Sequence, residues 1–162
     1  FQLYLNQVLS YDIAVIGVIM GVRTAGFCTA TFLSGRLTDR LGPRPVITVG
    51  LLVEGICLYF YTTTSSLTYI IVIGLVEGVG GGTIWVTLSV LLSRAVAPRM
   101  RGSAVGLYRT FHALGGILGP IIFMFAYDSV GRTVPFLAGA ALLVANLPLV
   151  VSIRKRHMLE GI

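Results

Sequence analysis

The sequence predicts an all-α membrane protein with five transmembrane helices. Of its 162 residues, 56% are hydrophobic and only 11% are charged, and the mean hydropathy is +0.91. A soluble domain carries about 25% charged residues, because polar groups must cover its surface. Lipid is therefore the solvent that suits this composition. The charges that are present come in clusters between long apolar runs, which is the pattern of short loops that join membrane spans.

Five apolar stretches are long enough to cross a bilayer, which takes about 20 residues with a range of about 17–25. They comprise residues 13–34, 46–61, 67–92, 103–126 and 134–153. The loops between them cover residues 35–45, 62–66, 93–102 and 127–133. Because all four loops are short, we expect neighbouring helices to run antiparallel.

Local signals support most of the predicted helix starts. Asp12 can cap the first helix, and Pro43 and Pro45 flank the start of the second. The third follows a Thr-rich turn, and Pro98 precedes the fourth. Pro135 lies in the first turn of the fifth, where a missing N–H costs little.

Basic residues alternate between loops, and this alternation predicts the orientation. The basic segments are the first loop (Arg36, Arg40, Arg44), the third loop (Arg94, Arg99, Arg101) and the tail (Arg154, Lys155, Arg156). The second loop has no charge, and the fourth has only Arg132, which Asp128 offsets. The positive-inside rule then places the C-terminus in the cytoplasm and the start of the chain outside, in a plasma or inner membrane. The net charge of +6 is thus a topology signal for a lipid bilayer, and we expect no nucleic-acid partner.

The first basic loop contains a motif, G-R-L-T-D-R-L-G-P-R-P-V-I over residues 35–47. It resembles the G-x-L-a-D-r-x-G-r-k-x-x-l signature of the major facilitator superfamily, although Pro43 and Pro45 depart from the pattern. The matching residues are Gly35, Leu37, Asp39, Arg40, Gly42, Arg44 and Ile47. The resemblance implies that this gating loop steadies one closed state of a transport cycle.

Elementary chemistry agrees with that implied role. We expect Gly35 to let the first helix end against a neighbour, and Gly42 to supply a turn conformation that a side chain would oppose. Asp39 is the only acid among three Arg residues of the loop. An acid at this place can pair with the N-terminus of a neighbouring helix.

The resemblance covers nearly the whole chain and implies five helices of a six-helix half-bundle, with the missing half of the transporter as a partner. The chain begins with Phe1, so we interpret it as a fragment. The later spans resemble the tenth to twelfth helices, so we expect helices eight to twelve of the C-terminal half. Helices two to six of the N-terminal half are the alternative, since both halves carry the loop motif. Gly115, Gly119 and Pro120 resemble the G-x-x-x-G-P core of the antiporter motif of the fifth helix, but its following Gly-Gly pair is absent.

Six polar side chains lie near the centres of the spans: Arg23, Glu54, Glu77, Arg109, His112 and Asn146. The candidate substrate pathway consists of four of them, Arg23, Glu77, Arg109 and His112. A charge at a helix centre costs about 2.5–3.5 kcal/mol on insertion scales, so such groups should face a water-filled cavity or one another. Arg109 and His112 are three residues apart and share one helix face. With Arg23 they could bind an anionic substrate.

Glu77 is the leading candidate for proton coupling, because alternating exposure could load and release a proton. The alternative is a permanent ion pair between Glu77 and Arg23. For His112 alone, a satisfied core histidine is the alternative. Glu54 lies on the second span, and the resemblance places that helix outside the central cavity, which implies structural pairing for its carboxylate.

Small residues predict where helices pack closely. Gly74, Gly78 and Gly82 form two overlapping G-x-x-x-G steps on the third span. Gly115, Gly119 and Pro120 are the packing candidates on the fourth. Pro120 also lies inside its span, where neighbouring groups can satisfy the carbonyl that it frees.

These observations predict a secondary active transporter that moves a small solute by alternating access, with protons as the coupling ion. A facilitative uniporter is one alternative, and a non-transporting membrane scaffold or receptor is another. We expect no enzyme, cofactor or metal, because the sequence has no H-E-x-x-H motif and no nucleophile–base set.

Overall fold

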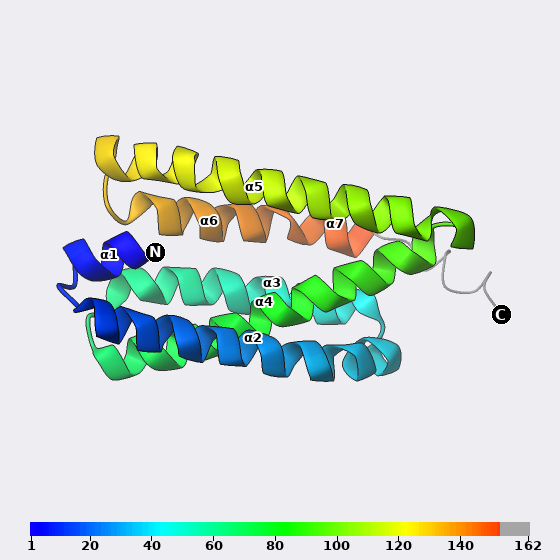
Figure 1. The fold of residues 1–162 in the computed structure, drawn as a ribbon, viewed down its shortest axis with the longest axis horizontal. Coiled ribbons are helices and arrows are strands. Elements are labelled where there is room, and N and C mark those ends of the chain that lie inside the picture. The colour runs from blue at the N-terminus through cyan, green and yellow to red at the C-terminus, as the bar shows by residue number, and fades with distance from the viewer. Residues whose placement is uncertain (153–162) are drawn as a thin grey trace.

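The computed structural model describes residues 1–152, which form helices and no strands. The basic tail of Arg154, Lys155 and Arg156, and the last residue of the fifth predicted span, lie outside the described residues. The elements are α1 (Gln2–Gln7), α2 (Ile13–Leu41), α3 (Pro43–Thr63), α4 (Leu67–Ala95), η1 (Pro98–Met100), α5 (Arg101–Ser129), α6 (Val134–Ala145) and α7 (Leu147–Ser152). The predicted all-α class is confirmed (Figure 1).

Five helical segments are long and apolar enough to cross a membrane. They are Ile13–Leu41, Pro43–Thr63, Leu67–Ala95, Pro98–Ser129 and Val134–Ser152. Many of their large apolar side chains lie on the surface, among them Phe111, Ile121 and Phe125 on α5. Water would penalise such a surface, whereas hydrocarbon does not. The five-span membrane class predicted from composition is therefore confirmed.

The end of α2 differs from the expectation. The Asp12 side chain caps α2 by accepting a 2.8 Å hydrogen bond from the Ile13 N–H, but the helix does not end at Gly35. It continues to Leu41, and Gly42 alone separates it from α3. Gly42 has φ = +83°, a conformation that side chains oppose, and Pro43 disfavours helical geometry at the residue before it. Most of the motif is thus helical, because its first stop signal is the Gly42-Pro43 pair.

The last segment is interrupted at Asn146, between α6 and α7. Pro148 follows two residues later and has no N–H to donate to the preceding turn. The Asn146 side-chain amide donates to the Leu142 carbonyl at 2.7 Å, so this polar group is satisfied by its own helix. In contrast, α5 runs unbroken through Pro120.

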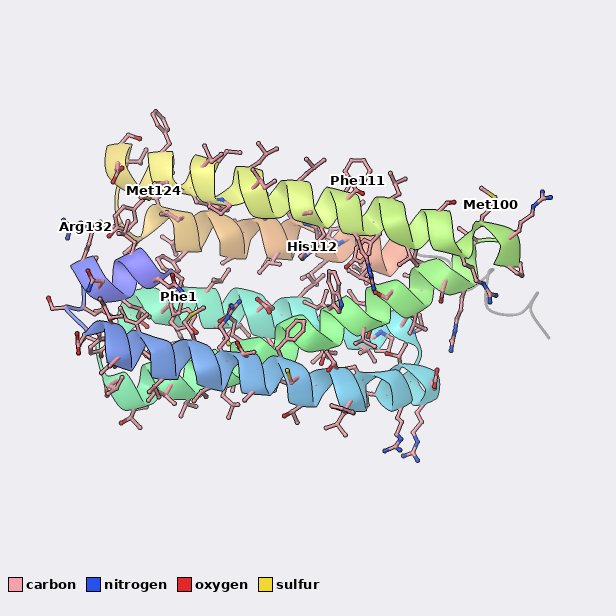
Figure 2. All side chains as sticks on the ribbon, viewed as in Figure 1. Phe1, Met100, Phe111, His112, Met124 and Arg132 are labelled. Atoms are coloured by element: carbon pink, nitrogen blue, oxygen red, sulfur yellow. The ribbon has the colours of Figure 1, made fainter. Side chains whose placement is uncertain are left out.

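The helices run alternately in opposite directions, so that their turns gather at two ends (Figure 1). The α2–α3 and α4–α5 turns share one end, and the α3–α4 and α5–α6 turns share the other. Met100 and Arg132, labelled in Figure 2, mark these opposite ends. The two Arg-rich turns, which were predicted to face the same side of the membrane, therefore lie at the same end of the bundle.

Glycine residues bring the backbones of α2 and α4 into contact. A Cβ atom added to Gly78 would fall against the Arg23 carbonyl oxygen, and one added to Gly82 would lie 2.5 Å from the Phe27 carbonyl oxygen. On the opposite helix, a Cβ at Gly26 would lie 2.5 Å from the Leu75 carbonyl oxygen. No side chain fits at these positions without moving a helix.

The other glycines that were predicted to pack closely have looser surroundings than Gly78 and Gly82. A Cβ on Gly74 would lie in ordinary van der Waals contact, 3.4 Å from the Tyr61 hydroxyl, 3.8 Å from the Ile19 carbonyl oxygen and 3.9 Å from the Arg23 Cβ. Around Gly115 and Gly119, no atom of residues 1–152 beyond the local turns of α5 lies within 4 Å of an added Cβ. Gly119 and Pro120 instead line a cavity of about 470 Å³ that α1 and α6 also border. The packing predicted for these α5 residues has no partner within residues 1–152.

Candidate functional site

A partly buried ion pair joins α2 to α4 near the middle of both helices. The Arg23 guanidinium donates through Nε to Glu77 Oε2 at 2.6 Å and through Nη2 to Glu77 Oε1 at 2.7 Å. Tyr61 of α3 donates a further hydrogen bond from its hydroxyl to Glu77 Oε2, at 3.1 Å. Three helices thus converge on one carboxylate, which accepts bonds on both oxygens.

The local sequence explains this geometry. Gly74 and Gly78 flank Glu77 on α4, and the absence of side chains there lets α2 approach until the two functional groups meet. The fork of the guanidinium matches a carboxylate, so both bonds form together. The pair is neutral as a whole, which reduces the cost of holding two charges at membrane depth.

The two partners differ in accessibility. The Glu77 side chain is 8% exposed, whereas that of Arg23 is 40% exposed. The Arg23 side chain is therefore partly accessible, whereas the Glu77 side chain is enclosed.

A second cavity, of about 790 Å³, lies between α2, α3, α4 and α5. Its lining residues are Phe27, Glu54, Gly81, Ile84, Trp85, Leu88, Tyr108, Phe111 and His112. The rings of Trp85 and His112 pack edge to face with centroids 4.6 Å apart, and Tyr108 lies 5.4 Å from Trp85. Figure 2 labels His112 on α5, and its ring contacts that of Trp85 on α4.

Glu54 lies in this cavity without a polar partner from the described chain. It forms no hydrogen bond or ion pair with residues 1–152, although structural pairing was the expectation. Its carboxylate fits because Gly81 opposite has no side chain: an added Cβ there would lie 2.7 Å from Glu54 Oε1. The lack of a polar partner for Glu54 was not predicted from the sequence. The run Gly80-Gly81-Gly82 was the signal, because glycines on a facing helix leave room for the carboxylate.

The three predicted anion-binding residues are not joined by contacts. Arg23 is paired with Glu77, and His112 packs against Trp85. Arg109 is exposed on α5, and within the described part of the chain it makes no hydrogen bond or ion pair. A joint role of Arg109 and Arg23 stays a prediction.

The motif at the basic end contacts α4 through side chains. Asp39 accepts a 2.7 Å hydrogen bond from Arg94, and both side chains are largely exposed. Beneath this ion pair, Thr38 bonds to Thr87 at 2.9 Å in a buried position. One turn further in, Ser34 donates to Thr83 at 3.1 Å.

The two hydroxyl contacts, Ser34–Thr83 and Thr38–Thr87, were not predicted from the sequence. Their signal was the matching four-residue spacing on each helix, which places Ser34 and Thr38 on one face of α2. Thr83 and Thr87 form the corresponding face of α4. Of the other motif residues, Gly35 has open space around it and Arg40 is exposed.

The fold and these sites define a multi-spanning helical membrane protein with polar groups at membrane depth. Residues 1–159 match the family described as the Major Facilitator Superfamily, and the chain belongs to this family. The predicted membership is confirmed. No solved structure matches the chain.

Curated relatives are transporters by name. The chain is 26% identical over 147 residues to the probable hexose phosphate transport protein of Chlamydia trachomatis, covering 90% of this chain and 32% of that protein. It is 26% identical over 160 residues to the nitrite extrusion protein of Bacillus subtilis, with 93% and 39% covered. It is 29% identical over 148 residues to the synaptic vesicular amine transporter of Mus musculus, with 87% and 27% covered. The chain thus spans about a third of the length of these relatives.

Proposed function

We propose that the polypeptide carrying this chain is a secondary transporter that moves a small solute by alternating access, coupled to protons. The observation that carries the proposal is the Arg23–Glu77 pair with its enclosed carboxylate, in a family whose curated relatives have transporter names. A buried charge pair is costly to assemble, and replacing such pairs with apolar residues often stabilises a protein. A functional role accounts for its presence better than stability does.

The coupling step follows from the contacts of the carboxylate. A proton on Glu77 removes its negative charge and with it the two charge-assisted bonds to Arg23. The partly exposed Arg23 side chain is then free to turn toward the solute route. Loss of the proton on the other side of the membrane re-forms the pair, so the two events are linked.

The helices that hold the pair move as one unit in this scheme. The carbonyl contacts at Gly78 and Gly82 leave no room for α2 and α4 to slide past each other. The Thr38–Thr87 bond and the Asp39–Arg94 pair continue that contact to the basic end. Alternating access then comes from motion of this unit against the remainder of the transporter, with the motif residues as the gate.

The orientation and register belong to the same proposal. The two Arg-rich turns face the cytoplasm of a plasma or inner membrane, and so does the C-terminus. The spans correspond to helices eight to twelve, and the partner is the other half of the same transporter.

A facilitative uniporter is the second candidate, and the Tyr61 hydrogen bond favours it. Three donors on one carboxylate can hold the Arg23–Glu77 pair closed throughout the cycle. In that case the pair joins α2 to α4 and carries no proton.

The test uses the full polypeptide in proteoliposomes, with labelled glucose 6-phosphate, nitrite and dopamine as solutes. These probes follow the names of the relatives, which differ in solute charge. We expect a pH gradient to drive uphill uptake of one of them, and Glu77→Gln to abolish uphill uptake while exchange continues. Uphill uptake that survives in Glu77→Gln would rule out the coupling role. A charge swap, Arg23→Glu with Glu77→Arg, restores an ion pair and serves as the control for folding.

A further inference from the structure

Among the described residues that line the cavity between α2 and α5, Glu54 is the only acid. Arg23 and Glu77 bond to each other, and neither residue lines this cavity. Besides Glu54, the ionisable residues that line the cavity are Tyr108 and His112 of α5, while Arg109 of the same helix is exposed and is not part of the lining. Among the lining residues, only His112 can carry a positive charge near neutral pH.

An acid at membrane depth needs a positive partner, since burial without one is costly. The His112 ring packs against Trp85, and no hydrogen bond joins it to Glu54 in the described chain. The space between the two side chains is part of the cavity that both line. Glu54 is therefore placed to accept a cation that enters this space.

The walls of the cavity decide which cation fits. The rings of Phe27, Trp85, Tyr108 and Phe111 line it, and aromatic faces attract cations through their quadrupole. A metal ion would need several oxygen, nitrogen or sulfur ligands, but residues 1–152 hold no group of three such side chains. The volume of about 790 Å³ is in the range of small-molecule sites.

We propose that this cavity binds a small organic cation, with Glu54 as the counter-charge and the aromatic rings as its walls. The inference rests on the proposed function in one respect, because the bound cation is then the solute that the transporter moves. An anionic solute is disfavoured, because Glu54 would repel it in a setting that screens charges poorly.

The experiment measures equilibrium binding of labelled tetraethylammonium to the purified full polypeptide. This probe is permanently charged, so it reports a cation site and not a proton site. We expect Glu54→Gln to weaken binding about tenfold or more, since a charge-assisted contact is lost. Phe111→Leu should weaken it about threefold, since a cation–π contact is lost. Asp128→Asn, at the end of α5, removes an acid outside the cavity and should leave binding unchanged.

Several outcomes would overturn the site. One is tetraethylammonium binding that Glu54→Gln changes by less than about twofold. Another is glucose 6-phosphate competing for the same site, and a third is no tetraethylammonium binding at all. If Glu54→Gln fails to fold, the exposed Phe111 still tests the site, because Phe111→Leu must then weaken binding on its own.

This test separates the site from the proposed function. Binding that depends on Glu54, without uphill transport of any solute, supports the site and counts against the transporter. Proton-driven uptake of glucose 6-phosphate without tetraethylammonium binding refutes the site and leaves the transporter intact.

Discussion

Replacing Gly78 with Ala tests the backbone contact on which the α2–α4 unit depends. The added methyl group would fall against the Arg23 carbonyl oxygen and lie 3.0 Å from the Phe27 amide nitrogen. Both are main-chain atoms, so a helix must shift to make room. Overpacking of this kind costs about 1–3 kcal/mol, and it also pushes Arg23 away from Glu77.

The assay is the free energy of unfolding of the full polypeptide in mixed micelles, from a denaturant titration. Gly17→Ala on α2 is the matched control, because within residues 1–152 no atom beyond the local turns of α2 lies within 4 Å of a Cβ at that position. The control should be neutral or stabilising by up to about 1 kcal/mol, since Ala is the better helix former. Equal effects of the two substitutions would refute the close contact.

Three further predictions follow from the contacts between α2 and α4. Thr38→Val should destabilise by about 1–3 kcal/mol, because the buried Thr87 hydroxyl loses its partner. The double variant Thr38→Val with Thr87→Val should cost less than the sum of the single ones in the same titration, and simple additivity would contradict the bond. Asp39→Asn should lower stability by less than about 1 kcal/mol, because the pair with Arg94 is exposed, but it should slow transport in proteoliposomes if the motif is a gate. A double-mutant cycle of Arg23→Gln and Glu77→Gln should give a coupling energy of about 1–3 kcal/mol, and a value near zero would mean that the two side chains do not interact.

The positions of the helices follow from composition, but their ends do not. Apolar runs report the part of a helix that lies in hydrocarbon, whereas α2 continues to Leu41 through charged residues that are still helix formers. Only Gly42 and Pro43 stop it, and the first Gly of the motif does not. Helix ends beyond the membrane are therefore set by backbone chemistry that hydropathy does not report.

The candidate site was predictable in part. The opposite charges on the first and third spans allowed two interpretations of Glu77, a proton-coupling residue or a permanent ion pair with Arg23. The structure places the two side chains in contact. The carboxylate of Glu54 could not be placed in the same way. Its surroundings depend on Trp85 and His112 from two other helices, and sequence spacing within one helix carries no information about that contact.

Cysteine accessibility tests the central claim, that these helices cross a bilayer with both Arg-rich turns on one side. Cys28 and Cys57 are first replaced with Ala, and single Cys residues are introduced at Arg40, Thr64, Arg99 and Arg132. A membrane-impermeant maleimide is then applied to right-side-out and inside-out vesicles. We predict that positions 40 and 99 react from the cytoplasmic side and positions 64 and 132 from the other. Labelling of positions 40 and 99 from opposite sides would contradict the account.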